Sequence, residues 1–336
     1  MSEELTYEQK SNIVKELSSC YDEKDNIEIC DHEKMKKIMN QKLNIDLEII
    51  KGIFESDFKK TKIEDDDFED DIFNTATSIL NGFYEKHPFL IPFVGKNYSK
   101  AKPQYLYVLE SHYLPDSSDF YELHYNMLDT EEEKNEWLKK QWYEKDFKWS
   151  NLKQFNENNT KSSEKEEIFL HREDIEYMWT ESVVKNNIRY NNKFKALFRN
   201  MLNPILDKNE KIESAVESIA FMNYFLRPSE DTGVSIKYEY IDSLFSYLNL
   251  IRVWEALGKP YIIICSAKVR NSFNGYWKKH NKISSNSENQ IPEDNLCLCN
   301  HPSNMSWNRK IEKFDNNEAK LKKFIESVEN SDSKNT

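Results

Sequence analysis

The sequence predicts an α/β protein with a three-layer α/β/α arrangement, built on a central, mainly parallel four-stranded sheet and preceded by a helical N-terminal region. In the second half of the chain, apolar runs of strand length alternate with patterns of helical spacing. That alternation is typical of a parallel sheet with helices on both of its faces. Hydrophobic residues make up 38% of the 336 residues and aromatic residues 13%, which is enough for a large core.

Residues 1–85 are predicted to form an acidic helical region. They hold 11 basic and 22 acidic residues, whereas the other 251 residues hold 36 basic and 37 acidic ones, so the acidity of the chain is an N-terminal property. The run EDDDFEDD at 64–71 is interpreted as a solvated link or the first turn of a helix, with a DNA-mimicking role as the alternative. This region is also a possible binding site for a protein partner.

The main domain is predicted over residues 86–320. Its boundary is placed at the Pro- and aromatic-rich stretch 87–98, which is interpreted as a connection. A first strand is predicted at 104–109 and a helical insertion at about 126–203. The last residues, 321–336, are expected to be a disordered tail.

The second half of the chain supplies the regular alternation of elements. Gly258 and Pro260 close a helix, and the continuous apolar run that follows is typical of a strand buried on both faces. The predicted elements are, in order, a strand within 217–228, a helix at 239–257, a strand at 261–267, a helix at 269–280 and a strand at 295–299.

Three of the predicted strands end in polar clusters: ESHY at 110–113, NYFLRP at 223–228 and NHPS at 300–303. In an open parallel sheet the functional crevice lies beyond the carboxyl ends of the strands. We therefore expect the three clusters to lie at one edge of the sheet.

The third cluster offers an imidazole and a hydroxyl. His301 could donate a hydrogen bond to negative charge that develops on a leaving group, or it could only end a strand before Pro302. Ser303 could hold the following turn or bind a phosphate oxygen.

The second cluster offers an amide and a cation. Asn223 stands in an apolar segment, and its two donors and one acceptor suit the edge of a base, although they could equally tie neighbouring loops together. Arg227 could reach a phosphate or pair with Glu110.

In the first cluster, Glu110 could position and activate a water molecule, with His112 as its partner or substitute. Tyr113 could stack on a base. An ion pair or a surface turn is the alternative for the whole cluster.

No metal and no cofactor are expected. Cys297, Cys299 and His301 would face the same way on a strand, which suggests zinc, but no second Cys/His pair completes such a site. The six glycines form neither of the common phosphate-binding loops. The N-terminus has no secretory signal and no apolar run could cross a bilayer, so we expect a cytoplasmic protein with reduced thiols and no membrane partner.

The three clusters, in this order, resemble the motifs of the uracil-DNA glycosylase superfamily. VLESHY at 108–113 resembles its first motif, MNYFLRP at 222–228 is similar to the Asn- and Arg-Pro-containing segment of the iron–sulfur branch, and NHPSNMSWNR at 300–309 is similar to the third motif of the uracil-specific branch. The resemblance covers about residues 88–315. Departures are Leu109 for the family's Gly, Ser111 for Asp, His112 for Pro, a gap of over 100 residues between the first two motifs, and no four-Cys cluster.

The resemblance implies a DNA glycosylase that hydrolyses the N-glycosidic bond of a damaged or deaminated base. Glu110 would assist the water, Asn223 would read the base, and His301 would stabilise the departing base. Ser303 would lie near phosphate, while Tyr113 or Phe225 would pack on the base. Two alternatives stay open: a catalytically inactive protein of the same fold that binds nucleic acid or a nucleotide, and an unrelated hydrolase that uses Glu110 and His112.

Overall fold

The structure is a computed structural model. It describes residues 21–24, 27–30, 80, 83–87, 90–114, 121, 125, 128–143, 178, 180, 183–184, 193–206, 211–230, 233–283, 290–302, 307 and 316–332. The strands are β1 (Tyr21–Lys24), β2 (Ile27–Cys30), β3 (Phe93–Val94), β4 (Tyr105–Leu109), β5 (Ala220–Asn223), β6 (Tyr261–Cys265) and β7 (Leu296–Cys299). The α-helices are α5 (Phe83–Lys86), α6 (Glu131–Leu138), α9 (Lys193–Leu202), α10 (Ile212–Val216), α11 (Tyr240–Ala256), α12 (Ala267–Ile283) and α13 (Asn317–Asp332).

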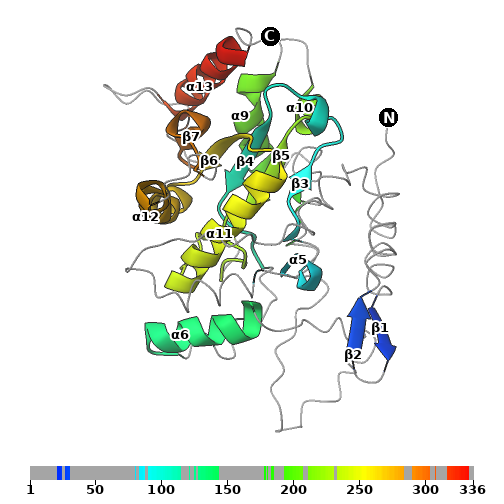
Figure 1. Cartoon of the computed structure of the whole chain (residues 1–336), viewed down its shortest axis with the longest axis vertical. Helices are drawn as coiled ribbons and strands as arrows, with labels where there is room; N and C mark the ends of the chain where they lie inside the picture. Colours follow the sequence, from blue (N-terminus) through cyan, green and yellow to red (C-terminus); the bar gives the residue numbers. More distant parts are fainter. Residues whose placement is uncertain are drawn as a thin grey trace.

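The central sheet has five strands in the order β3-β5-β4-β6-β7 (Figure 1). The pairs β5–β4, β4–β6 and β6–β7 are parallel, and β3 pairs antiparallel with β5. The predicted α/β class and mainly parallel sheet are therefore confirmed. The predicted number of four strands was wrong, because β3 adds a fifth strand at the edge.

Strand β3 falls inside the stretch 87–98 that was predicted as a connection. Only Phe93 and Val94 pair with β5. The chain then passes very close to the segment before β5, where a Cβ added to Gly95 would lie 2.3 Å from the carbonyl oxygen of Glu217. Gly95 is therefore required by the close approach of two backbones.

The side chains of the sheet contribute to two hydrophobic clusters, as alternation along a strand requires. Leu106 and Val108 of β4 lie in one cluster with buried residues of α11 and α12. Tyr105, Tyr107 and Leu109 lie in the other, with buried residues of α9, α10 and α13. Helices therefore contribute to both clusters, and Figure 1 shows the yellow helix α11 of the first cluster in front of the sheet.

Helix α13 occupies most of the stretch that was expected to be a disordered tail. It runs from Asn317 to Asp332, and Leu321, Ile325 and Val328 are buried in the second cluster. Their spacing of three and four residues gives the helix one apolar stripe along a largely charged surface. That stripe anchors the C-terminal part of the chain to the sheet.

The described parts of residues 1–85 differ from the predicted all-helical region. β1 and β2 form an antiparallel pair, and residues 31–79 lie outside the described part. Leu80, Phe83 and Tyr84 are buried in the same cluster as the sheet, so the core begins before residue 86. Within residues 126–203, where a helical insertion was predicted, the described part of the chain includes the helices α6 and α9.

Candidate functional site

The strand order defines where an open α/β sheet can form a crevice. From β4 the chain goes to β5 on one side, and β6 then adds to the other side of β4. In such a sheet the crevice lies at the carboxyl ends of the two central strands, where the strand order reverses. Glu110 follows β4 directly and Ser266 follows β6 directly, so these residues lie at that point.

Hydrogen bonds hold both oxygens of the Glu110 carboxylate. The Ser266 hydroxyl donates to Oε2 at 2.7 Å, and the backbone N–H of Ile236 donates to Oε1 at 3.2 Å. The Ser266 oxygen also accepts hydrogen bonds from the backbone N–H groups of Lys268 and Val269, so it caps the N-terminus of α12. The carboxylate therefore lies next to the N-terminal, positive end of a long helix.

His301 follows β7 and interacts with the same carboxylate. It is partly buried, and this burial lowers the pKa of its imidazole below the ordinary 6.5, while the negative charge of Glu110 acts in the opposite direction. The imidazole is therefore neutral at pH 7 and can donate a hydrogen bond without carrying a charge. From α9, the Asn200 side chain donates a hydrogen bond of 2.9 Å to the carbonyl of Pro302, the residue after His301.

Tyr113 lies close enough to Glu110 for the two to interact electrostatically. Burial raises the pKa of the Tyr113 phenol, and the charge of Glu110 raises it further. Its backbone forms an isolated parallel bridge with Ser229. The structure thus brings together Glu110, Tyr113 and His301, which come from two of the three predicted clusters.

Asn223 is the last residue of β5 and pairs in register with Leu109, one residue before Glu110. Beyond it, the backbone N–H of Phe225 donates a hydrogen bond of 2.9 Å to the carbonyl of Glu110. The Asn223 side chain is partly buried, and within the described part of the chain it makes no hydrogen bond. Its donors and acceptor are therefore not used by another side chain or backbone group within that part of the chain.

Two of the predicted site residues face the interior. Phe225 has no exposed surface, and its ring stacks on Tyr238 with a centroid distance of 4.9 Å, which leaves no ring face for a base. His112 is also buried, and its Nε2 lies 3.3 Å from the Thr180 hydroxyl. The structure thus assigns both residues packing roles, in contrast to the expected base stacking by Phe225 and partnership of His112 with Glu110.

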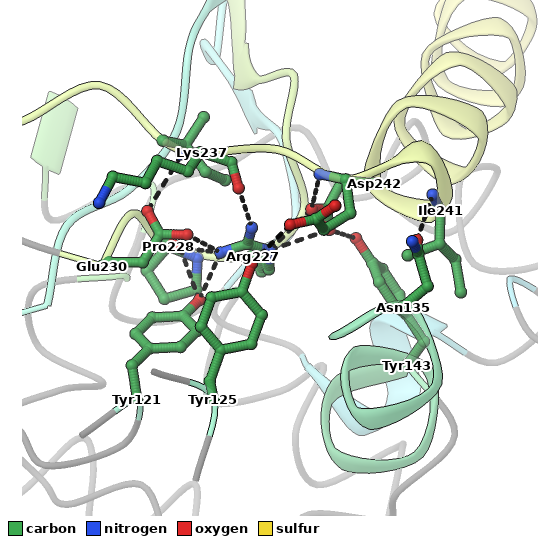
Figure 2. A network of polar contacts seen from close by, with 12 residues as sticks. Tyr121, Tyr125, Asn135, Tyr143, Arg227, Pro228, Glu230, Lys237, Ile241 and Asp242 are labelled. Atoms are coloured by element: carbon green, nitrogen blue, oxygen red, sulfur yellow. Dashed lines mark hydrogen bonds and ion pairs between the residues drawn. The ribbon is translucent and has the colours of Figure 1, made fainter. Parts of the chain in front are cut away.

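Arg227 has neither of its expected partners. It is fully buried, and its Nε donates hydrogen bonds to both carboxylate oxygens of Asp242 at 3.0 and 2.9 Å (Figure 2). Its Nη1 forms an ion pair of 2.9 Å with Glu230. An arginine held in this way cannot reach a phosphate, so the expected phosphate contact and the pair with Glu110 give way to a structural ion pair. Ser303 lies outside the described residues.

Two groups that hold Glu110 were not among the predicted site residues, the Ser266 hydroxyl and the Ile236 N–H. Ser266 had a usable signal, because a serine between an apolar strand and a helical pattern is a typical N-cap. The N–H of Ile236 had none, since it acts through its backbone from a loop.

Three buried cysteines lie on β6 and β7. The sulfur atoms of Cys297 and Cys299 are 3.6 Å apart, and Cys265 pairs in register with Cys299. Among the residues that the structure describes, no group of His, Cys, Asp and Glu side chains has the geometry to hold a metal ion.

Comparisons with protein-family models, with curated proteins and with solved structures found no match to this chain. The likeness to the uracil-DNA glycosylase superfamily thus stays a prediction from three motifs. A separate finding concerns membranes: in the described ranges, no helix combines the length and apolar character needed to span a bilayer.

Proposed function

We propose that the chain is a DNA glycosylase-like hydrolase that cleaves the N-glycosidic bond of a damaged or deaminated, uracil-type base in DNA. We further propose that the sheet and its helices form a three-layer α/β/α arrangement and that the binding partner is DNA. The observation that supports it is the electrostatic interaction of Glu110 with His301 at the carboxyl edge of the sheet, with the amide of Asn223 on the adjacent strand.

The chemistry needs a base for water and a donor for the leaving group. The Glu110 carboxylate would take a proton from water as the water oxygen forms a bond to the sugar carbon. As the bond from that carbon to the base nitrogen breaks, its electrons would go to the base, and neutral His301 would donate a hydrogen bond to the developing anion. A neutral imidazole suits this role because its proton is available at pH 7.

Recognition would depend on a base that leaves the duplex stack. The amide of Asn223 would bind its polar edge, and the ring of Tyr113 offers a surface for stacking. Tyr113 is the aromatic candidate that supports this step, since Phe225 already stacks on Tyr238.

The test is an abasic-site assay on single- and double-stranded oligonucleotides that each contain uracil or another modified base. We expect the wild-type protein to release at least one of these bases, and Glu110→Gln and His301→Ala each to abolish the release. Lys96→Met, at a distant exposed ion pair with Glu217, is the matched control and should keep full activity. If the wild-type protein leaves every modified base in place, the glycosylase proposal fails.

A second candidate is a protein of the same fold that binds nucleic acid or a nucleotide without cleaving it. The internal roles of His112, Phe225 and Arg227 favour it, because three expected ligand contacts are used for packing. It requires tight, salt-sensitive binding to DNA with no abasic product. Cleavage by the wild-type protein in the same assay would exclude it.

A further inference from the structure

Ile236 and Lys237 form a two-residue bridge between the Glu110 carboxylate and a buried ion-pair network. All four of their backbone polar groups bind side chains. The Ile236 N–H donates to Glu110, and its carbonyl accepts from the Lys268 ammonium. The Lys237 N–H donates to Oε2 of Glu230 at 3.1 Å, and its carbonyl accepts from Nη2 of Arg227 at 2.7 Å.

The far end of this bridge is firmly anchored (Figure 2). Arg227 is fully buried, and the Glu230 side chain is only 7% exposed. Asp242 ties Arg227 to the first turn of α11, where it also accepts from the Glu239 N–H at 2.9 Å. A buried arginine whose nitrogens all bind protein groups is a rigid support, because any movement would leave a buried charge without partners.

The hydroxyl groups of two tyrosines, Tyr121 and Tyr143, also bind the Arg227–Asp242 pair. Tyr121 accepts a hydrogen bond of 3.0 Å from Nη1 of Arg227 and donates one of 2.7 Å to the Pro228 carbonyl. Tyr143 donates a hydrogen bond of 2.7 Å to Asp242. The network therefore joins the segment after β5, the start of α11 and the region around α6.

The near end of the bridge determines how the carboxylate of Glu110 is turned. The terminal torsion of a glutamate is soft, so a single hydrogen bond does not fix its plane. Ser266 holds one oxygen and Ile236 the other, so the plane is fixed only while Ile236 stays in place. The position of Ile236 in turn depends on its neighbour Lys237, which Arg227 and Glu230 hold by both backbone groups.

We propose that Arg227 and Glu230 are positioning residues, which set the orientation of the Glu110 carboxylate toward His301 through Ile236 and Lys237. The consequence for catalysis rests on the glycosylase function proposed above. The orientation itself does not, and it can be measured without any substrate.

The test uses Glu230→Gln in the full-length chain. Glu230 accepts from Arg227 with one oxygen and from Lys237 with the other, whereas a glutamine of the same shape has one acceptor and one donor. The matched control is Glu217→Gln, because Glu217 also joins two donors, Lys96 and Asn97, at a site away from the sheet edge.

The readout is the pKa of His301, followed by NMR through its ring signals. We expect Glu230→Gln to shift this pKa by a few tenths of a pH unit and Glu217→Gln to leave it unchanged. In a Glu110→Gln background, Glu230→Gln should have no further effect, since the shift passes through Glu110. An unchanged pKa, or the same shift with and without Glu110, would overturn the proposal.

If Glu230→Gln does not fold, Lys268→Met gives a second route, because it removes the partly buried ammonium group that holds the Ile236 carbonyl. We expect Lys268→Met to shift the pKa of His301 more when Glu110 is present than in the Glu110→Gln background. Equal shifts in the two backgrounds would contradict the proposal. If the wild-type protein cleaves DNA, Glu230→Gln should lower kcat and leave KM nearly unchanged. If it cleaves nothing, the glycosylase function fails, and the NMR comparison still decides the positioning role.

Discussion

The hydroxyl of Ser266 joins the start of helix α12 to the carboxylate of Glu110. Its oxygen accepts hydrogen bonds from the backbone N–H groups of Lys268 at 3.1 Å and Val269 at 3.3 Å. Its O–H donates a hydrogen bond of 2.7 Å to the carboxylate of Glu110. One small side chain thus caps a 17-residue helix and holds the acid at the end of the central strand. The geometry of the candidate site and the stability of the fold are linked at this residue.

Ser266→Ala should therefore be costly. Loss of an N-cap costs roughly 0.5–2 kcal/mol, and a hydrogen bond to a charged group contributes about 1.5–3 kcal/mol. We expect the free energy of unfolding, measured with urea, to fall by about 2–4 kcal/mol. Ser272→Ala, which removes a buried hydroxyl from the same helix at a contact with Tyr224, should cost about 1 kcal/mol or less. Equal losses in the two variants would contradict the role given to Ser266.

Arg227→Met should destabilise the protein by about 3–5 kcal/mol, because it leaves the buried charge of Asp242 without its partner. Arg227→Lys should also be destabilising, since an ammonium cannot replace the planar guanidinium that reaches Asp242, Glu230 and Lys237 together. Lys96→Met, at the exposed pair with Glu217, should cost only about 0–1 kcal/mol. Urea unfolding of the three variants checks this order, and a stable Arg227→Met variant would exclude a structural ion pair.

His301 should make the stability of the protein depend on pH. Burial lowers its pKa in the folded state below 6.5, so at mildly acidic pH the unfolded chain binds more protons than the folded one. The free energy of unfolding should thus fall as the pH drops through 6.5, and this part of the fall should end below the folded-state pKa. Unfolding of wild type and His301→Gln at several pH values measures the contribution. Since the charge of Glu110 raises the pKa of His301, Glu110→Gln should lower this pKa further, and a rise would contradict their pairing.

Two glycine substitutions should have opposite effects. Gly95→Ala places a Cβ 2.3 Å from a backbone oxygen of Glu217, so two backbone segments must shift, at a cost of about 1–3 kcal/mol. Gly275 is an exposed residue within α12 and has no atom within 4 Å of its added Cβ. Gly275→Ala should therefore stabilise the protein by about 0.5–1 kcal/mol through helix propensity. Thermal unfolding of both variants tests this pair, and two shifts of Tm in the same direction would contradict it.

The main elements of the sheet could be predicted because each is an apolar run with clear limits. β6 and β7 lie within their predicted ranges, and α11 falls within one residue of its own. β3 could not be predicted in this way, since two residues form a strand only through their pairing with β5. Helix α13 was missed because its apolar residues are spaced through a charged segment.

The candidate site was predicted in part. Placement of Glu110 and His301 followed from the rule for carboxyl ends of parallel strands, and their interaction agrees with it. The burial of Arg227 could not be read from NYFLRP, because its partner Asp242 is 15 residues further along the chain. An arginine can bind a phosphate or a carboxylate of the same chain equally well. Which of the two it binds depends on how the loop after β5 folds back.

The central place of β4 has a consequence for how this chain is made. Leu106 pairs with Ala220, 114 residues later, and with Ile262, 156 residues later. At a synthesis rate of about 5–20 residues per second, β4 leaves the ribosome roughly 8–30 seconds before its second neighbour exists. Until β5 emerges both edges of β4 are unpaired, and one edge then stays unpaired until β6 emerges; unpaired edges invite pairing with other chains. The nascent chain is therefore open to pairing with other chains until β6 has emerged.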